Sequence, residues 1–598
     1  MMHAKPCHKP MAAFPRHALS ILSLCALAAC GGGQGNSAST GAGGSAVASR
    51  PMSADVDTGE DDHEAPVDFG AGPVGAAGPV TETLKQLSAA GALADVNKPV
   101  LPAPAAYTAG VFGPAFAWPV MPIHMVLLPD GRVLAYGTDD KGVQGAALHY
   151  AVWDPSWDPA VPGADISPFQ LLPNVTGTDI FCGTQLVLPS SGEVLLAGGD
   201  RPVNGKRNYA VADVNFFNPA DNSMRRDAVP MNYRRWYGTA VTTATGEVVV
   251  MGGRDDRDFP GVGLFPPTAA TYSATPEIFT PGLGWRSLTT AHSNEAFGEI
   301  RGNWWYPESW LAPDGRIWTI TNDGYFYALD PAGTGTLTKF DAKLQGTNWN
   351  TLSLMYAPGK ILSVRNTTSV ALVDIQSGLP VITPAAPLST ARKWGFGTVL
   401  ADGTVWVNGG SVDANTLADA VYTSELFDPA TGQWTPTASA TKARMYHSSS
   451  LLLPSGAVLT GGGGSPGPVR NLNAELYYPS YLFNPDGSEA TRPVIGDVAP
   501  AAFAWSSAFT VALASPATIE RVMLVRTGSS THSFNNEQRA LALPFTQLDG
   551  QTLSVTAPAS ATEMPPGYYM LFVLQRNALA PEGQARLVPS VARIVKLG

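Results

Sequence analysis

The stretch MVLLPDGRVL (residues 125–134) sets the pattern on which the fold depends. Two short apolar runs flank a turn that contains Gly131, an arrangement typical of a β-hairpin. The same pattern returns, at spacings of 44 to 69 residues, around Gly192, Gly246, Gly315, Gly359, Gly403 and Gly456. Repeats of this length fit one four-stranded blade each. We therefore expect an all-β chain that contains a seven-bladed β-propeller.

Glycine pairs refine this expectation and set its limits. They follow the second apolar run of four copies, at 198–199, 252–253, 409–410 and 461–462, as in kelch-type blades. The repeat spans residues 106–490 and stops at about Arg492. Residues 491–598 hold alternating runs such as RVMLV (521–525), which favour a small immunoglobulin-like β-sandwich. The sequence thus predicts two folded domains.

The composition excludes several classes of protein. Hydrophobic residues make up 44% of the 598 residues and charged residues 14%, which excludes a disordered chain. Lysine and arginine number 37 against 48 acidic residues, so the net charge of −11 offers no basic surface for nucleic acid. We expect no nucleic-acid partner, and we expect a monomer.

The N-terminal segment is typical of an exported protein. Residues 1–29 combine basic residues with an apolar run that is short for a membrane span, which predicts a signal peptide. The run LAAC (27–30) before three glycines resembles a bacterial lipobox. We therefore expect Cys30 to carry lipid and to anchor the protein to a membrane at the periplasmic or cell surface; a secretory signal cleaved near Ala29 is the alternative. Residues 30–105, rich in glycine, alanine, serine and proline, are expected to form a flexible tether.

The cysteine count leaves one thiol to explain. Cys7 and Cys25 leave with the signal and Cys30 would carry lipid, so Cys182 has no cysteine left for an intrachain disulfide. An inert buried thiol is one interpretation. A chemical role is the other, and the repeat register bears on it.

Unusual side chains stand at the head of the first apolar run in several copies. Cys182 and Tyr446 lie ten residues before their turn glycines, and Tyr237 and Trp394 lie nine before theirs. The innermost strands of a propeller surround one axis, so equivalent positions on different blades converge at one mouth. A thiol, two phenols and an indole are therefore expected to meet, with His447 directly after Tyr446.

Four motifs carry a resemblance to a known family. The runs FCG (181–183), RWYG (235–238), RMYHS (444–448) and THS (531–533) resemble, in order, the motifs of the copper radical oxidases, the galactose oxidase and glyoxal oxidase family. The likeness covers about residues 110–598. The runs around Tyr237 and at 303–307 (NWWYP) look closer to the glyoxal oxidase branch.

The resemblance implies a metal site and a modified side chain. It implies a thioether between Cys182 and Tyr237, and Cu(II) held by Tyr237, Tyr446, His447 and His532. Imidazole nitrogens with phenol oxygens suit tetragonal Cu(II) better than Mg²⁺, Ca²⁺ or a thiolate zinc site, so the chemistry of the residues agrees. Both members of the Tyr446–His447 pair can reach one metal only where their strand begins or bends, since successive side chains of a regular strand point to opposite faces. His532 can contribute only if its loop in the last domain reaches the propeller axis.

The sequence departs from the family at one position. In galactose oxidase a tryptophan soon after the matching glycine pair stacks over the cross-linked ring; here the register places Asp255 there. Trp394 or Trp349 could shield the ring instead. Trp394 and Asp255 are also candidates for the substrate pocket, although a solvated loop is the simpler interpretation for Asp255.

Other residues are interpreted as ordinary parts of the fold. His124, His149 and His292 have no ligand spacing and are expected to be hydrogen-bonded or surface histidines. Trp304 and Trp305 are expected to pack within a blade.

Two functions remain open on the sequence. The first is an oxidase that converts a primary alcohol, aldehyde or sugar with O2 and releases H2O2, using Cys182, Tyr237 and Tyr446 as catalytic residues. The second is a propeller without catalysis that binds glycans or surface partners, because propellers serve both purposes. The complete set of motif residues favours the oxidase.

Overall fold

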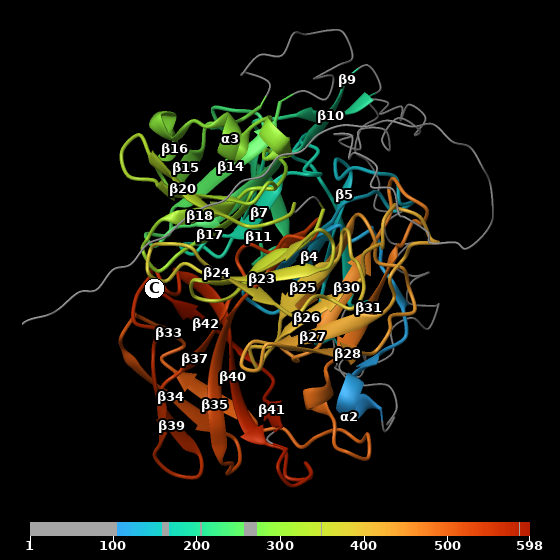
Figure 1. Cartoon of the computed structure of the whole chain (residues 1–598), viewed down its shortest axis with the longest axis vertical. Coiled ribbons are helices and arrows are strands. Elements are labelled where there is room, and N and C mark those ends of the chain that lie inside the picture. The colour runs from blue at the N-terminus through green and yellow to red at the C-terminus, as the bar shows by residue number, and fades with distance from the viewer. Residues whose placement is uncertain (1–104, 158–166, 204–205, 256–271, 348–349, 585) are drawn as a thin grey trace, which may run out of the picture. The chain divides into compact units, whose positions relative to one another are not determined.

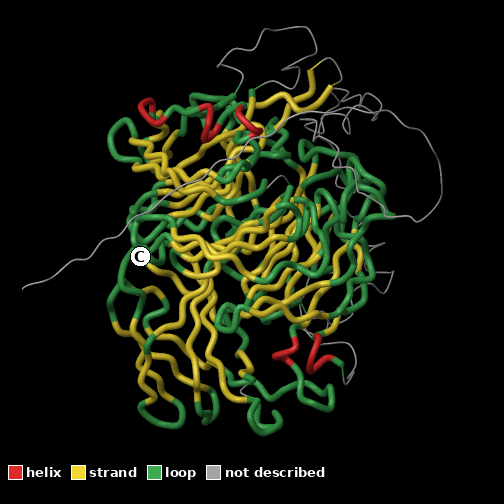
Figure 2. The backbone as a smooth tube through the Cα atoms, in the orientation of Figure 1, coloured by secondary structure: helices red, strands yellow, loops and turns green. Residues whose placement is uncertain are grey.

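The computed structural model describes residues 105–157, 167–203, 206–255, 272–347, 350–584 and 586–598. The predicted signal peptide, and the tether up to residue 104, lie outside the described residues. Strands dominate the described part of the chain and helices are few and short (Figure 2). The all-β prediction is confirmed.

Each of the seven turn glycines lies between the first two strands of a separate antiparallel sheet. All seven have positive φ, from 71° to 91°, a conformation that glycine adopts without strain. Within the described residues, the blades in chain order are β3 (His124–Leu127), β4 (Val133–Tyr136), β5 (His149–Trp153) and β6 (Phe169–Pro173); β7 (Thr184–Val187), β8 (Val194–Ala197), β11 (Val214–Asn218) and β12 (Ser223–Arg226); β13 (Trp236–Thr242), β14 (Val248–Arg254), β15 (Glu277–Thr280) and β16 (Gly284–Ser287); β17 (Glu308–Leu311), β18 (Ile317–Ile320), β19 (Tyr325–Asp330) and β20 (Thr336–Lys343); β21 (Ser353–Ala357), β22 (Lys360–Arg365), β23 (Ser369–Asp374) and β24 (Val381–Ala385); β25 (Phe396–Val399), β26 (Val405–Asn408), β27 (Ser424–Asp428) and β28 (Gln433–Thr437); and β29 (Ser448–Leu452), β30 (Val458–Gly462) and β31 (Asn473–Tyr478).

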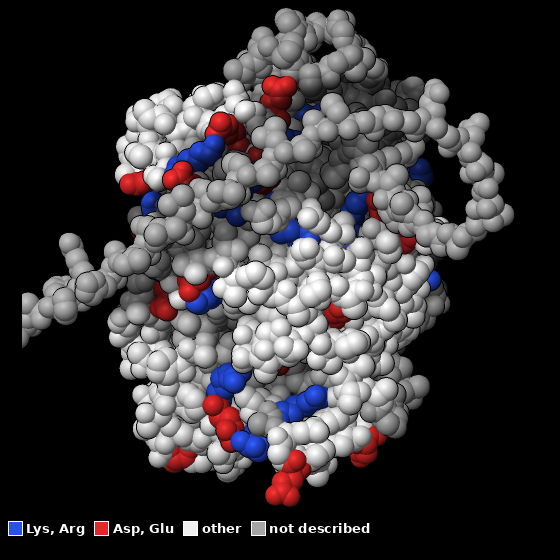
Figure 3. Space-filling view, in the orientation of Figure 1, with Lys and Arg blue, Asp and Glu red and all other residues white. Residues whose placement is uncertain are grey.

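The seventh blade is closed by the start of the propeller. Strands β1 (Val111–Phe112) and β2 (Phe116–Ala117) both pair antiparallel with β31, so the two ends of the repeat share one sheet. The remaining elements of the propeller region are α2 (Ala106–Ala109), β9 (Asp200–Val203), β10 (Lys206–Ala210), η2 (Thr289–Ala291), α3 (Asn294–Phe297), η3 (Ile300–Gly302) and η4 (Ser480–Leu482). Among the described residues, no helix is long and apolar enough to cross a membrane. On the face shown in Figure 3, charged side chains are scattered over a largely uncharged surface.

Three blades contain the same buried ion pair. An arginine before the first strand contacts a glutamate of the third strand at 3.0 to 3.1 Å and donates to a carbonyl of the glycine pair. The pairs are Arg235–Glu277, Arg392–Glu425 and Arg444–Glu475. Tyr237, Trp394 and Tyr446 each follow the arginine by two residues. The repeat therefore fixes the backbone from which these side chains project.

The C-terminal domain is a β-sandwich (Figure 1, orange to red), as predicted. Its core includes Phe509, Val511, Leu553 and Leu571. One sheet consists of β32 (Ile495–Ala499), β34 (Ala508–Leu513), β39 (Thr552–Thr556) and β38 (Phe545–Gln547); the other of β33 (Ala502–Phe503), β42 (Arg593–Leu597), β40 (Gly567–Arg576), β35 (Ile519–Arg526) and β37 (Ala540–Leu543), with β41 (Leu587–Pro589) paired to β40.

One strand of this domain joins the propeller. β36 (Ser529–Thr531) pairs antiparallel with β3, so that Thr531 lies opposite His124, and it becomes an extra inner strand of the first blade. The segment was expected to be a loop that reaches the axis; it reaches the inner edge of a blade as a strand. His532 follows it directly.

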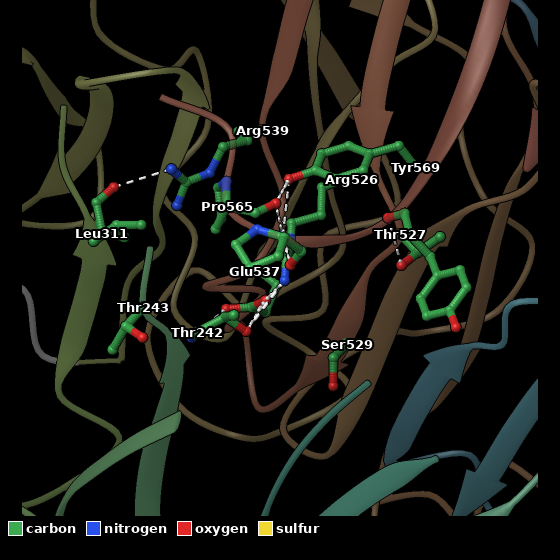
Figure 4. A network of polar contacts seen from close by, with 12 residues as sticks. Thr242, Thr243, Leu311, Arg526, Thr527, Ser529, Glu537, Arg539, Pro565 and Tyr569 are labelled. Atoms are coloured by element: carbon green, nitrogen blue, oxygen red, sulfur yellow. Dashed lines mark hydrogen bonds and ion pairs between the residues drawn. The ribbon is translucent and has the colours of Figure 1, made fainter. Parts of the chain in front are cut away.

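Buried polar contacts hold the inserted segment in place (Figure 4). Glu537 contacts Arg526 at 2.5 Å and accepts hydrogen bonds from the backbone N–H and the hydroxyl of Thr242, in the third blade. Arg539 donates to the carbonyl of Leu311, in the fourth. Burial alone would raise the pKa of Glu537, but the charge of Arg526 and the hydrogen bonds from Thr242 lower it below the usual 4.5. The segment is thus anchored on both sides of β36.

Candidate metal centre

The predicted site residues stand at the ends of inner strands, in an uncommon backbone conformation. Cys182, Tyr237, Trp394, His447 and His532 all have positive φ, between 47° and 68°. Residues other than glycine rarely adopt this backbone conformation, because their Cβ crowds the backbone. Such strain persists only where the surrounding structure imposes it, and it concentrates at functional sites. The pattern marks the mouth of the propeller as a candidate site.

Backbone hydrogen bonds align the neighbouring blades there. The N–H of Tyr237 donates to the carbonyl of Cys182 at 2.9 Å, and the N–H of Tyr306 donates to the carbonyl of Tyr237 at 2.9 Å. Three successive blades are therefore linked at the height of the site. Cys182 and Tyr237, 55 positions apart in the sequence, become neighbours through the main chain.

The two predicted tyrosine ligands meet. The hydroxyl oxygens of Tyr237 and Tyr446 lie 2.5 Å apart and both side chains are buried. Two phenol oxygens at this separation can share one proton or face one cation.

His447 presents a nitrogen that is ready to bind a metal. Its Nδ1 donates to the carbonyls of Gly464 and Ser465 at 3.0 and 2.8 Å, so its Nε2 carries the lone pair. That Nε2 is buried and has no hydrogen-bond partner among the residues that the structure describes. Burial lowers the pKa of His447 to about 4, although the two backbone hydrogen bonds raise it, so the ring is neutral at neutral pH. His447 directly precedes β29, at the beginning of the strand, where the sequence argument required it.

His532 and Cys182 complete the cluster. Ligand atoms of Cys182, His447 and His532 all lie within 4.8 Å of one another. The Sγ of Cys182 lies 3.7 Å from Nε2 of His532, and Nδ1 of that ring contacts the hydroxyl of Thr531 at 2.5 Å. Burial, with the nearby His447 and His124, holds the pKa of His532 well below 6.5. Both histidines thus offer neutral imidazoles, the form that binds metals.

The donor set fits copper. Two phenol oxygens and two neutral imidazoles converge, one imidazole nitrogen lacks any other partner, and N,O donors of this kind suit a tetragonal Cu(II) site. The carbonyls of Gly464 and Ser465 accept from Nδ1 of His447 and so fix its tautomer and ring orientation.

The aromatic shield over Tyr237 differs from the predicted alternatives. The ring of Trp236 stacks on that of Tyr237, with centroids 3.6 Å apart and planes 18° apart, and Trp305 contacts it at 4.5 Å. Trp394 instead lies beside Tyr446, at 6.0 Å, and Trp349 is outside the described residues. The positive φ of Tyr237 turns the chain so that two adjacent rings can stack, which strand periodicity did not reveal.

Trp304 and Trp305 also belong to the site, rather than to blade packing alone. The ring of Trp304 is nearly parallel to that of Tyr237, at 6.3 Å and 13°. Arg254 lies over the rings of both Trp236 and Trp304, at 4.6 and 5.1 Å. Trp304 and Trp305 directly precede Tyr306, whose N–H donates to the carbonyl of Tyr237. Their place in the run before the fourth blade was the sequence feature that could have indicated their role.

Asp255 lies where a partly exposed ion pair forms. Its carboxylate is 3.4 Å from Arg234, with side-chain exposures of 33% and 49%. It occupies the register position predicted, and the solvated interpretation agrees with this exposure.

His124 is hydrogen-bonded, as one of the two expectations had it, and its partners place it beside the candidate site. Its Nε2 accepts the N–H of Cys182 at 3.2 Å, and its ring meets that of His532 at 5.5 Å. No metal-ligand spacing in the sequence points to His124, because its position depends on the pairing of β3 with β36, a strand from another domain.

The described propeller and β-sandwich together bring two tyrosines, two histidines and a cysteine to one place, the residues on which the resemblance to the copper radical oxidases rests. Comparisons with known proteins agree. The family described as galactose oxidase-like, early set domain matches residues 492–597. Galactose oxidase from Gibberella zeae is 26% identical over 518 residues, covering 82% of this chain and 70% of the relative.

A second branch of relatives matches at similar identity. Aldehyde oxidase GLOX from Vitis pseudoreticulata is 24% identical over 484 residues, covering 72% of this chain and 84% of the relative. A fungal alcohol oxidase solved in complex with copper shares the fold, with a TM-score of 0.66, 22% identity and coverage of 82% of this chain and 99% of that one. The resemblance drawn from the motifs is confirmed: the chain is similar to galactose oxidase and to an aldehyde oxidase over most of its length.

Proposed function

We propose that this protein is a copper radical oxidase that converts a primary alcohol or an aldehyde with O2 and releases H2O2. The observation that carries the proposal is the convergence of Tyr237, Tyr446, His447 and His532, with the free lone pair of His447 buried among them. Relatives named galactose oxidase and aldehyde oxidase support it.

The four converging residues would hold the metal. Bound copper supplies one-electron redox chemistry and a place where the substrate oxygen and O2 meet. The chain's own residues then orient the reactants and exclude water, as proximity catalysis requires. Both imidazoles are neutral and fixed, so they reorganise little on binding.

The two tyrosines take different roles. Tyr446 is the more exposed, at 9% against 1% for Tyr237, and it faces Trp394, so we assign it the proton of the substrate hydroxyl. We assign Tyr237 the carbon-bound hydrogen, through a thioether with Cys182 that donates electron density to the ring. For an alcohol, two protons and two electrons in total leave the substrate and pass to O2, giving the aldehyde and H2O2.

The surroundings suggest the substrate pocket. We propose that Trp394, half-buried beside Tyr446, contacts substrate. Asp255 is the weaker candidate because Arg234 already pairs with it. The NWWYP run beside Tyr237 favours the glyoxal oxidase branch, and hence small aldehydes.

The test uses the full chain loaded with Cu²⁺. Oxygen uptake and H2O2 release are measured with small aldehydes, primary alcohols and hexoses, and the intact mass is measured for the loss of two hydrogen atoms. We expect turnover and cross-linking in the wild type, and neither in Cys182→Ser. A copper-loaded wild type that consumes no O2 and keeps Cys182 alkylatable would instead favour the propeller that binds glycans or surface partners.

We also propose that the chain is an exported lipoprotein anchored through Cys30. Labelling of expressing cells with a radioactive fatty acid is expected to mark the wild type and not Cys30→Ser. An unlabelled wild type found in the medium would favour the secretory alternative.

A further inference from the structure

A chain of hydrogen bonds runs from the inserted strand to the backbone of Cys182. The amide nitrogen of Gln185, in β7, donates to the carbonyl of Ser530 in β36 at 3.2 Å. Its Oε1 then faces Nδ1 of His124 at 3.0 Å. The Nε2 of that ring lies 3.2 Å from the N–H of Cys182.

The donors and acceptors in this series of hydrogen bonds can be assigned in only one way. Because the amide of Gln185 donates to a carbonyl, its Oε1 can only accept, so Nδ1 of His124 must carry the hydrogen. Nε2 then keeps its lone pair and accepts the N–H of Cys182. Tyr136 reinforces this order: its hydroxyl donates to the same Oε1 at 3.2 Å, and its ring stacks on that of His124 at 4.5 Å and 7°. Burial lowers the pKa of His124 to about 3, which agrees with a neutral ring.

Nε2 of His124 accepts its hydrogen bond from a residue, Cys182, whose backbone conformation is itself unfavourable. Cys182 has φ of 56°, outside the regions that non-glycine residues prefer, and its side chain is fully buried. A hydrogen bond to its N–H favours this conformation over the alternatives. The second constraint on the same residue is the bond from Tyr237 N–H to its carbonyl.

We infer that His124 is a positioning residue that holds the backbone of Cys182 in the conformation needed for thioether formation, and that docking of β36 sets its tautomer through Gln185. The inference rests on the proposed function. In the step concerned, the S–H of Cys182 and one ring C–H of Tyr237 are lost and a C–S bond forms. Two protons and two electrons pass to O2, which becomes H2O2.

The experiment compares three full-length proteins: the wild type, His124→Leu and His124→Gln. Leucine has a similar size but no acceptor, whereas the Oε1 of glutamine can approach the place of Nε2. After addition of Cu²⁺ in air, we measure bound copper, the loss of two hydrogen atoms in the peptides containing Cys182 and Tyr237, and alkylation of Cys182. Substitution of residues that orient the ligands of a metal site typically lowers metal affinity or activity about 10- to 100-fold.

We expect His124→Leu to bind Cu²⁺ but to cross-link about 10- to 100-fold more slowly than the wild type. His124→Gln is expected to recover much of the wild-type rate. A merely structural role would lower copper binding and cross-linking together and would not be rescued by glutamine. Cross-linking of His124→Leu at the wild-type rate would overturn the inference.

A second readout needs neither copper nor activity. In the metal-free proteins, hydrogen exchange of the peptide that contains Cys182 is measured by mass spectrometry. Its amide is expected to be protected in the wild type, less so in His124→Leu, and protected again in His124→Gln. Equal exchange in the wild type and in His124→Leu would overturn the inference. If His124→Leu fails to fold, loss of protection of the Cys182 amide in a folded His124→Gln would overturn it instead. A wild type that never cross-links with Cu²⁺ and O2 would refute the proposed function instead, which separates the two failures.

Discussion

The proposed metal centre draws its candidate ligands from two regions of the molecule that position them differently. Tyr237 and Tyr446 come from blades, each two residues after a buried arginine that a glutamate of the same blade holds. His532 comes from β36, a strand that the C-terminal domain adds to the first blade. The blade ligands follow a repeated pattern, whereas the inserted ligand depends on docking between domains. The difference implies that the site forms only after both domains have folded and docked.

The largest effect that would sharpen this comparison is loss of one histidine from each region. We expect His447→Ala and His532→Ala each to lose copper on gel filtration and to release H2O2 at least about 10³-fold more slowly, because each variant lacks one of the four proposed ligands. Copper content and peroxide production are measured, with His149→Ala in β5 as the matched control. Full copper retention in His532→Ala would mean that the blades suffice.

The next test removes the anchors of the two regions. Glu475→Ala leaves Arg444 uncompensated in the seventh blade, and Glu537→Ala leaves Arg526 uncompensated beside the inserted strand. Breaking a buried ion pair from one side costs about 3–5 kcal/mol, so we expect each variant to lose that much free energy of unfolding. Denaturant titration of the metal-free chain measures it.

The two anchor variants should differ in what else they lose. Glu537→Ala is expected to raise hydrogen exchange in β36 without affecting β30 and β31, and Glu475→Ala the reverse. Equal loss of protection in both regions would show that blade and insertion unfold as one unit, and the distinction drawn above would fail.

The pH dependence of stability tests the anchor of the inserted strand without removing it. The pKa of Glu537 in the folded chain is below 4.5, so its contribution to stability is complete above about pH 4.5 and is lost as the pH falls through the folded value. The wild type is therefore expected to lose stability on acidification in this range, and Glu537→Gln to lose less. Thermal unfolding followed from about pH 7 down to about pH 3, through the ordinary pKa of a glutamate, measures this. Parallel pH profiles for the two proteins would contradict the assignment.

The same contrast explains what the sequence could predict. The turn glycines and the register of Cys182, Tyr237 and Tyr446 repeat along the chain, so spacing alone predicted seven blades and the convergence of these residues. His532 followed only from the resemblance. His124 was expected to be hydrogen-bonded or on the surface, but the sequence could not predict its partners, because Cys182 and the residues of β36 are brought to it by long-range strand pairing that local sequence does not encode.

The other difference between prediction and structure is the identity of the ring that stacks on Tyr237, and it arises from local backbone conformation. The alternatives for shielding Tyr237 were chosen by register, but Trp236 stacks on it although regular strand geometry sends adjacent side chains to opposite faces. The positive φ of Tyr237 breaks that rule. Such a conformation is imposed by neighbouring blades, through the bonds to Cys182 and from Tyr306, and no periodicity in the sequence signals it.

The smallest expected effect compares the two indoles that flank the tyrosines. Trp236→Phe keeps a ring but reduces the stacked area on Tyr237, and aromatic pairs contribute about 0.5–1.5 kcal/mol beyond burial. We expect a stability loss in that range and a shorter-lived oxidised form, followed by the decay of its visible absorption. Trp394→Phe, beside Tyr446, is expected to change KM while leaving that decay unchanged. If Trp394→Phe shortened the lifetime and Trp236→Phe did not, the shield would belong to the Tyr446 side, and the roles assigned to the two tyrosines would have to be exchanged.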